Sequence, residues 1–206
     1  MIGLKQIAII DYGAGNLLSV EKALKHLGCS CVVTADPAVL AAADGAILPG
    51  VGAFGDAMAQ LRDRGLEEPI RAFAASGKPF LGICLGLQIL FESSEESPGV
   101  PGLGLLKGKV LRLPGDLGLK VPHMGWNSLR LTGNNGLFAG VGEEPYVYFV
   151  HSYYLRAEEE IVTATAEYGV TIHAAVRKRN VMACQFHPEK SGDVGLKMLA
   201  NFAAIL

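Results

Sequence analysis

The first half of the chain alternates short, wholly apolar runs with longer amphipathic stretches. A run that is apolar throughout is typical of a parallel strand buried on both faces, and helical spacing of apolar residues indicates a helix. The resulting order, β-α-β-β-α-β-α, predicts a mostly parallel sheet with flanking helices. The expected strands are Lys5–Asp11, Cys29–Val33, Ala46–Leu48 and Phe80–Ile83, and the expected helices end near Leu27, span Asp56–Ser76 and run from Leu85 to near Ser93–Ser94.

The second half consists mainly of strand-like segments, followed by a closing helix. Short turns such as Tyr168–Gly169 and Arg179–Asn180 separate several of these segments and indicate antiparallel hairpins. The chain has no internal repeat, low-complexity tract or linker, so we expect one α/β domain. The expected strands are Gly108–Leu113, Trp126–Leu131, Tyr146–Leu155, Ile161–Ala166, His173–Arg177 and Val181–Phe186, and the expected helix is Ser191–Leu206.

Cys84 stands where the last apolar run of the first half gives way to helical spacing, with Gly82 and Gly86 on either side. A nucleophile at a sharp strand-to-helix turn needs such small neighbours, because its backbone is strained there. The positive end of the helix dipole also favours a reactive thiolate. The alternative is a small buried cysteine that packs like alanine at the end of a core strand.

The segment His187-Pro188-Glu189 follows the last expected strand and offers partners for this thiol. Side chains two residues apart in an extended segment point to the same side, and the proline stiffens the backbone between them. A carboxylate beside an imidazole orients the ring and supports its protonated form. Cys84, His187 and Glu189 therefore supply a nucleophile, a base and an orienting acid. The alternatives are a surface turn, or a metal site for which the other histidines show no matching spacing.

The loop Pro49–Gly52 follows the third expected strand. Its glycines let backbone N–H groups turn toward a ligand, although an ordinary turn has the same composition. In a doubly wound sheet the loops at the carboxyl ends of the strands share one crevice. We therefore expect the N–H groups of Gly52 and Leu85 to form an oxyanion hole beside Cys84.

A second glycine-containing loop, Asp11–Leu17, does not complete a nucleotide-binding fingerprint. Gly13 and Gly15 are present, but Leu18 occupies the place of the third glycine. The sequence therefore predicts no nucleotide cofactor at this loop. Asn16 either caps the following helix or reaches outward, and the sequence leaves both readings open.

Composition excludes several classes of function. The 206 residues are half hydrophobic and 18% charged, as in a globular α/β protein, and the net charge of −2 without a basic run gives no support for binding nucleic acid or a membrane surface. No apolar stretch reaches membrane-spanning length, and no signal-peptide pattern opens the chain. Four cysteines are too few for a disulfide scaffold, so we expect a reduced, cytoplasmic protein. Cys29 and Cys31 are expected to fill the core rather than bind metal.

Three motifs in combination, Gly82–Gln88, Pro49–Gly52 and His187–Glu189, resemble the class I, or triad, glutamine amidotransferases. The resemblance runs essentially end to end, without a departure at the triad. It implies a flavodoxin-like α/β fold and one type 1 glutamine amidotransferase domain over residues 1–206. Further motifs resemble one branch of the family, the glutaminase subunits of imidazole glycerol phosphate synthase in histidine biosynthesis: Asp11–Asn16, Pro122–Asn127, Tyr148–Tyr153 and Lys190.

The resemblance implies a role for each candidate residue. Cys84 attacks the side-chain amide of glutamine, and His187, held by Glu189, protonates the departing ammonia and then activates water. Gly52 and Leu85 stabilise the oxyanion. Gln88 lies one helical turn past Cys84 and would hold the substrate's α-amino or carboxylate end, unless it is an ordinary surface glutamine. The residues that complete the expected glutamine site are Gly50, Glu96, Ser152 and Tyr153.

The chain has no phosphate loop and no acceptor domain, so its ammonia has to reach a partner protein before water protonates it. The resemblance identifies that partner as a (β/α)₈-barrel cyclase that forms imidazole glycerol phosphate and AICAR. It also implies low glutaminase activity until the partner binds, with an adjustment of the Pro49–Gly52 peptide, and it implies no cofactor and no metal. Aromatic side chains suit such an interface, although a single Trp is also a common core residue. The expected interface residues are Asn16, Met124, Trp126, Tyr148 and Lys190.

Rival functions are weighed against particular residues. The glutaminase of pyridoxal phosphate synthesis shares the chemistry, but Asp11–Asn16 and Pro122–Asn127 argue against it. A cysteine peptidase is disfavoured by the His187–Glu189 order and by Gln88. A hydrolase of the dienelactone hydrolase type is disfavoured because its acid precedes the histidine. A non-catalytic binding subunit is disfavoured by the intact triad.

Overall fold

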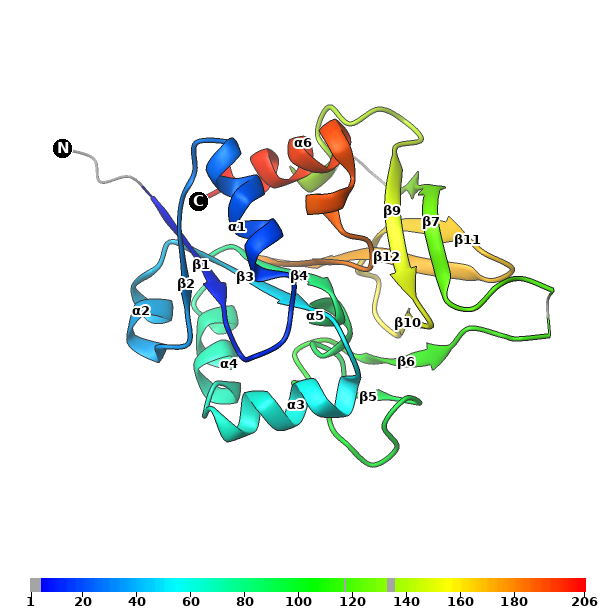
Figure 1. Cartoon of the computed structure of the whole chain (residues 1–206), viewed down its shortest axis with the longest axis horizontal. Helices are drawn as coiled ribbons and strands as arrows, with labels where there is room; N and C mark the ends of the chain where they lie inside the picture. Colours follow the sequence, from blue (N-terminus) through cyan, green and yellow to red (C-terminus); the bar gives the residue numbers. More distant parts are fainter. Residues whose placement is uncertain (1–4, 117, 133–135) are drawn as a thin grey trace.

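The centre of the molecule is a twisted sheet, seen in a computed structural model that describes residues 5–116, 118–132 and 136–206 (Figure 1). Within these residues the sheet has eight strands: β1 (Gln6–Ile10), β2 (Ser30–Thr34), β3 (Gly45–Gly50), β4 (Phe80–Cys84), β8 (Arg130–Leu131), β11 (Val162–Glu167), β12 (Thr171–Lys178) and β13 (Val181–Cys184). Their order is β2-β1-β3-β4-β13-β12-β11-β8. The strands from β2 to β13 pair in parallel, and β12, β11 and β8 continue antiparallel. The predicted α/β fold with a mostly parallel sheet is confirmed.

Helices cover both faces of this sheet, as Figure 1 shows. One face carries α1 (Leu17–His26) and α6 (Gly192–Ala203), and the other carries α2 (Pro37–Ala42), α3 (Phe54–Asp63) and α4 (Glu67–Ala75). The side chains of β1 alternate between two apolar clusters: Ile7 and Ile9 join the cluster of α1 and α6, and Ala8 and Ile10 join the other. The central strands are therefore buried on both sides, which explains their continuous apolar runs.

Smaller sheets and turns extend the fold beyond the last parallel strands. One sheet has the order β10-β6-β5, and a separate antiparallel pair is formed by β7 and β9. In the part of the chain that the structure describes, no helix is long and apolar enough to span a membrane. The remaining elements are α5 (Leu85–Gln88), β5 (Ser93–Ser94), β6 (Gly108–Arg112), β7 (His123–Ser128), β9 (Tyr146–His151), β10 (Tyr153–Ala157) and the short 3₁₀ helices Gly136–Phe138 and Pro188–Lys190.

The single helix expected over Asp56–Ser76 is wrong, because α3 and α4 are separate helices. Gly65 lies between them with a φ of 65°, a left-handed conformation that ends a helix. The N–H of Leu66 bonds back to the carbonyl of Leu61 and closes this end.

Helix α2, between the second and third strands, was not predicted from the sequence. Pro37 opens this helix, and the side chain of Asp36 accepts a hydrogen bond of 2.8 Å from the N–H of Ala38. An Asp-Pro pair of this kind is a helix start signal. The helix is only six residues long, so its apolar periodicity is too short to stand out.

The helix after Cys84 is shorter than expected, since α5 ends at Gln88 rather than near Ser93–Ser94. The backbone carbonyls of Ile89–Phe91 accept hydrogen bonds from the N–H groups of residues 103–106. These carbonyls would otherwise serve the next turn of the helix. The competing partners lie more than ten residues further along the chain, where local periodicity gives no sign of them.

Two expected strands each divide between sheets. The segment Tyr146–Leu155 bends at Ser152, so that β9 pairs with β7 whereas β10 pairs with β6. The segment Trp126–Leu131 breaks at Leu129, and β8 joins the central sheet beside β11. The hairpin turns at Tyr168–Gly169 and Arg179–Asn180 are confirmed by the antiparallel pairing of β11 with β12 and of β12 with β13.

Candidate active site at the end of the parallel sheet

Cys84 lies at a sharp turn from β4 into α5, with a φ of 55° and a ψ of −111°. A positive φ is uncommon for any residue other than glycine and marks a strained backbone. The neighbouring glycines make the turn sterically feasible. A Cβ at Gly82 would lie 2.8 Å from the carbonyl oxygen of Gly86, and a Cβ at Gly86 would collide with the carbonyl oxygen of Leu48. The backbone therefore forms the strand-to-helix elbow that the sequence predicts.

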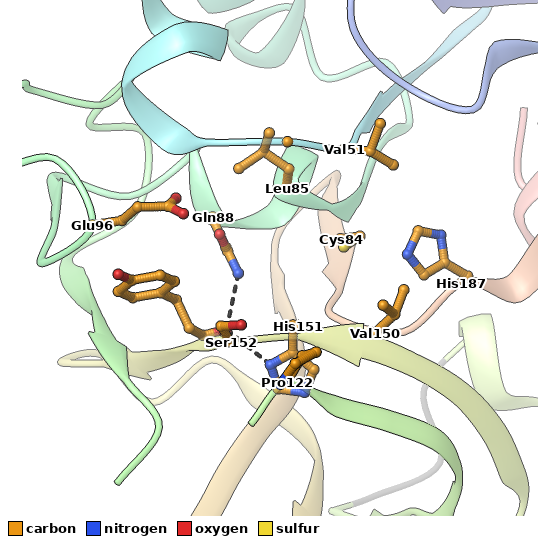
Figure 2. A pocket seen from close by; sticks show the side chains of 12 residues that line it. Val51, Cys84, Leu85, Gln88, Glu96, Pro122, Val150, His151, Ser152 and His187 are labelled. Carbon is orange, nitrogen blue, oxygen red and sulfur yellow. Dashed lines mark hydrogen bonds between the residues drawn. The ribbon is translucent and has the colours of Figure 1, made fainter. Parts of the chain in front are cut away.

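The Cys84 thiol faces a cavity of about 370 Å³ (Figure 2). Although Cys84 is only 7% exposed, the cavity reaches its side chain, so the sulfur is accessible to a small ligand. The parallel neighbours β3 and β4 end together here, as expected at the carboxyl edge of such a sheet. The lining comes from six separate parts of the chain and comprises Val51, Gly52, Cys84, Leu85, Gln88, Glu96, Pro122, Val150, His151, Ser152, Tyr153 and His187.

His187 and Glu189 form a buried pair beside this thiol. The Nδ1 of His187 lies 2.8 Å from Oε1 of Glu189, and the two side chains are 2% and 1% exposed. A carboxylate accepts hydrogen bonds, so Nδ1 carries a proton and Nε2 is the nitrogen left for chemistry. Among the described residues Nε2 has no hydrogen-bond partner. Figure 2 shows the imidazole beside Cys84 at the same wall of the cavity.

The charge state of His187 follows from its surroundings. Burial disfavours the imidazolium, but the Cys84 sulfur and the Glu189 carboxylate outweigh burial and raise the pKa of His187 to about 9. The site therefore favours a protonated imidazole next to a sulfur at neutral pH. This is the arrangement that a thiolate nucleophile and a general acid require.

The expected oxyanion donors lie on two sides of the thiol. Leu85 is the first residue of α5, so its N–H has no partner inside the helix. Gly52 has a φ of 100°, and a Cβ added there would meet no atom within 4 Å, so its backbone is open to the cavity. Gly50 is different: it is buried at the end of β3, and a Cβ there would lie 2.6 Å from the Tyr12 hydroxyl. Gly50 does not line the cavity and supports it from behind.

Gln88 is held in one orientation. Its Nε2 donates to the carbonyl of Tyr153 at 3.0 Å and to Oε1 of Gln185 at 3.0 Å. Both amide hydrogens are therefore used, and only its oxygen remains for a ligand. Gln88 is 5% exposed, so the alternative of an ordinary surface glutamine is wrong.

Glu96 lines the cavity but already has a structural partner. One carboxylate oxygen, Oε2, accepts a hydrogen bond of 2.8 Å from the N–H of Phe54, the first residue of α3. A negative charge at a helix N-terminus is stabilising. The second oxygen of Glu96 is the one that remains for a cationic group in the cavity.

Three residues at this site were not predicted from the sequence. Gln185 donates from Nε2 to the Cys84 sulfur at 3.7 Å. His151 lines the cavity and contacts the Tyr153 carbonyl through Nδ1 at 2.8 Å. Tyr12 is fully buried near Cys84. Its burial, and to a smaller extent the nearby sulfur, raise the pKa of its hydroxyl. One signal was present: Gln185 lies two residues before His187 in an extended segment, where side chains share a side.

The residues expected at a partner interface lie next to this site. Met124 and Trp126 on β7 are 62% and 57% exposed, and the ring of Trp126 meets that of Tyr148 on β9 edge-on at 6.1 Å. Lys190 is also exposed. Asn16 precedes α1 without a capping hydrogen bond from its side chain, so the helix-cap alternative is wrong. Exposed apolar side chains gathered in this way are typical of an interaction surface.

The other titratable groups do not form a second centre. Within the ranges that the structure describes, no three His, Cys, Asp or Glu side chains gather as metal ligands would. Cys29 and Cys31 are partly buried and pack against the cluster of α1 and α6, as expected of core-filling residues.

Sequence comparison places this geometry among known proteins. A family model described as glutamine amidotransferase class-I matches residues 8–206. The chain is 53% identical over 200 residues to imidazole glycerol phosphate synthase subunit HisH of Methanothermobacter thermautotrophicus, covering 97% of this chain and 98% of that protein. It is 54% identical over 204 residues to the protein of the same name from Moorella thermoacetica, covering 98% of this chain and 96% of that protein.

Solved structures share the architecture at lower identity. The structure of PurLQS from Thermotoga maritima is similar with a TM-score of 0.76 and 23% identity, over 97% of this chain and 98% of that one. A crystal structure of a glutamine amidotransferase is similar with a TM-score of 0.75 and 24% identity, over 98% of this chain and 100% of that one. At these identities the two structures establish the fold.

Proposed function

The chain belongs to the class I glutamine amidotransferases, and from this premise we propose that it is the glutaminase subunit of an imidazole glycerol phosphate synthase. It hydrolyses glutamine to glutamate and ammonia and delivers the ammonia to a cyclase. The observation that carries this proposal is that Cys84 lines one cavity together with His187, which is paired with Glu189, in a chain more than 50% identical to proteins of that name.

The chemistry starts at the Cys84 sulfur. The thiolate attacks the side-chain carbonyl carbon of glutamine, and a C–S bond forms as the carbonyl becomes an oxyanion. The N–H groups of Gly52 and Leu85 stabilise that oxyanion, and each such donor is worth about 3 kcal/mol in other enzymes. The C–N bond then breaks, and the protonated Nε2 of His187 gives its proton to the departing ammonia.

The second half of the reaction regenerates the thiolate. His187, now neutral, accepts a proton from water through Nε2, and the hydroxide equivalent attacks the thioester. The C–S bond breaks and glutamate leaves. Glu189 keeps Nδ1 protonated throughout, because its oxygen lies 2.8 Å away and accepts that proton's hydrogen bond.

We assign the substrate's amino-acid end to the opposite wall of the cavity. The free oxygen of Gln88 and the second oxygen of Glu96 accept hydrogen bonds from the α-ammonium group, and backbone groups of Ser152 and Tyr153 bind alongside. Gly50 contributes by holding the elbow from behind, since it does not face the cavity.

The proposed partner is a (β/α)₈-barrel cyclase that uses the ammonia to form imidazole glycerol phosphate and AICAR. Its docking surface comprises the exposed residues Met124 and Trp126 together with Asn16, Tyr148 and Lys190. All four cysteines are unpaired. This supports the further proposal that this subunit and its cyclase work in the reducing cytoplasm.

The test is an ammonia-release assay with glutamine, with and without the cyclase. We expect the wild type to release ammonia faster in the complex, and Cys84→Ala to release none above background in either case. The matched control is Cys31→Ala, which removes a partly buried thiol on the edge strand β2 that does not line the cavity. Undiminished ammonia release by Cys84→Ala would refute the triad. If ammonia release did not change with this cyclase but increased with the synthase subunit of pyridoxal phosphate synthesis, that subunit would be the partner instead.

A further inference from the structure

A hydrogen-bond chain leads from the nucleophile to the face of β7. Gln185 donates to the Cys84 sulfur at 3.7 Å, and its Oε1 accepts from Nε2 of Gln88 at 3.0 Å. The same Nε2 donates to the carbonyl of Tyr153 at 3.0 Å, which also receives Nδ1 of His151 at 2.8 Å. Figure 2 draws the two bonds that meet on this carbonyl.

The hydrogen-bond chain continues from His151 to a second histidine, His123. Nε2 of His151 lies 2.9 Å from Nδ1 of His123, and Nε2 of His123 lies 3.4 Å from Nδ2 of Asn127. The imidazole of His123 is stacked between the rings of Phe149 and Tyr168, with centroids 4.7 Å and 3.9 Å away. Both histidines are thus fixed in place as well as hydrogen-bonded.

One carbonyl sets the direction of every bond in this chain. The Tyr153 oxygen only accepts, so Gln88 presents its NH₂ group and His151 presents a protonated Nδ1. Gln88 then donates its second hydrogen to Oε1 of Gln185, which leaves the NH₂ of Gln185 to point at the sulfur. In the same way Nε2 of neutral His151 accepts from Nδ1–H of His123. No arrangement of these hydrogen bonds lets the linked side chains accept a proton from Cys84.

We propose that Gln185 is a catalytic residue for the glutaminase reaction, one that donates an amide hydrogen to the Cys84 thiolate and stabilises it. Gln88, His151 and His123 are positioning residues that hold this amide in its donating orientation. The inference rests on the proposed function and adds to it a second stabiliser of the nucleophile besides His187. Gln185 is fully buried, so its hydrogen bond is not exchanged for one with water.

Other groups also face the sulfur and have to be separated from Gln185. Tyr12 approaches from the loop after β1, Cys184 from β13, and His187, paired with Glu189, from the segment after β13. None of the three hydrogen-bonds to Gln185 among the described residues. A change at Gln185 therefore leaves the triad pair in place and removes one donor.

The decisive experiment measures how fast iodoacetamide alkylates Cys84 as a function of pH, with the site located by mass spectrometry. Gln185→Met keeps the volume and removes the donor, whereas Gln185→Glu replaces the donor by a carboxylate. We expect the pH of half-maximal alkylation to rise in both variants, by about one unit or more for Gln185→Glu. Glutamine turnover should fall about 10-fold to 100-fold, as for the loss of a hydrogen bond to a charged group.

Asn180→Asp is the matched amide-to-acid control. Asn180 uses its side-chain amide as a donor, to the carbonyls of Ala74 and Lys78, but it lies at the opposite end of β13. We expect this variant to lose stability without a change in the alkylation profile. A folded Gln185→Met variant with the wild-type alkylation profile would overturn the proposal.

A measurement on the wild type covers the case in which the Gln185 variants do not fold. The side-chain amide signals of Gln185 in a ¹H–¹⁵N spectrum should shift as Cys84 ionises, and Cys84→Ser should abolish that shift. Gln185 amide signals that do not shift as Cys84 ionises would also overturn the proposal. Neither readout uses glutamine or the cyclase, so a failed glutaminase assay and a failed role for Gln185 remain distinguishable.

The positioning role of His123 is tested with two substitutions at that residue. His123→Phe removes the donor to Nε2 of His151, whereas His123→Asn keeps an N–H near the place of Nδ1. We expect His123→Phe to raise the pH of half-maximal alkylation and His123→Asn to restore it toward the wild-type value. Equal shifts in the two variants would show that His123 serves packing alone.

Discussion

Individual side chains at this site act through their protonation states. Cys84, His187 and Glu189 are tied together by one hydrogen bond and two charges, which together raise the pKa of His187 to about 9. Burial lowers the pKa of both histidines, but at His151 burial prevails and the pKa falls to about 3. Two imidazoles that line one cavity are therefore kept in different states, one charged for proton transfer and one neutral for hydrogen bonding.

Glu189→Gln tests the charged state. The variant keeps the shape of the side chain but removes the charge that supports imidazolium and the fixed acceptor for Nδ1–H. We expect kcat for glutamine to fall about 10³-fold to 10⁴-fold, as in other triads whose acid is neutralised. Steady-state ammonia release measures the effect, and a loss below tenfold would remove Glu189 from the triad.

The same pair has a signature in stability. In the folded protein the pKa of His187 is about 9, above the ordinary histidine value of 6.5. The interactions of His187 with Cys84 and Glu189 therefore stabilise the fold fully below about pH 6.5, and this contribution is lost as the pH rises through about 9. In urea titrations the wild type should lose free energy of unfolding between these values, and Glu189→Gln should lose less. Parallel curves for both proteins would contradict the raised pKa.

The sequence predicted the triad because each member belongs to a local pattern: a glycine-flanked cysteine, and a histidine and a glutamate two residues apart. It did not predict Gln185, whose bond to Cys84 joins positions 101 residues apart. Nor did it predict the pairing of His123 with His151, which depends on the register of β7 against β9. Contacts of this kind arise only when strands find their neighbours.

Elements place these residues through close backbone approach. The elbow after β4 holds because Gly86 lies against the carbonyl of Leu48 on the neighbouring β3. The periodicity of the chain predicted the central strands well, since burial on both faces leaves a continuous apolar run. It joined α3 and α4, which a left-handed Gly65 separates, and it extended α5, which ends where backbone bonds from residues 103–106 take the next carbonyls. Local apolar spacing carries no information about either cause.

Gly86→Ala tests the close approach. The added methyl group meets the Leu48 carbonyl, so the elbow has to shift, and overpacking of this kind costs roughly 1–3 kcal/mol. We expect a lower free energy of unfolding in urea and a loss of ammonia release. Gly115→Ala is the control, because a Cβ there meets no atom within 4 Å. Equal stability of the two variants would show that the elbow does not need its glycine.

At the scale of the whole molecule, acid should weaken the fold through its buried neutral histidines. Burial lowers the pKa of His151 to about 3 and that of His123 to about 4. Between these values and the unfolded value near 6.5 the unfolded chain binds more protons, so stability falls as the pH falls. His151→Asn, which cannot be protonated, should reduce this slope by up to about 1.4 kcal/mol per pH unit.

Urea titrations between pH 6.5 and pH 4 measure that slope. His26→Asn is the matched control, because it makes the same change at an exposed position on α1. We expect its slope to equal that of the wild type. A wild-type slope in His151→Asn as well would show that His151 takes up a proton in the folded protein.

The proposed partner surface and the segment that carries His187 are joined directly by hydrogen bonds. The carbonyl of Tyr148 accepts the N–H of His187 at 3.0 Å, and the N–H of Tyr148 donates to the Ser191 hydroxyl at 3.0 Å. Tyr148 in turn supports the exposed ring of Trp126. A protein that covered Trp126 would contact Tyr148, the β9 residue whose carbonyl holds the backbone N–H of His187.

Trp126→Ala tests whether this surface binds the cyclase. A central exposed tryptophan is a typical binding hot spot, so we expect the dissociation constant to rise about 30-fold or more. Ile205→Ala is the control, since Ile205 is 40% exposed beyond the end of α6, at the other edge of the molecule. Calorimetric titration of both variants with the cyclase measures the effect. If Ile205→Ala weakened binding as much as Trp126→Ala, the cyclase would dock elsewhere, and the ammonia would have to leave the cavity by a route that avoids the β7–β9 face.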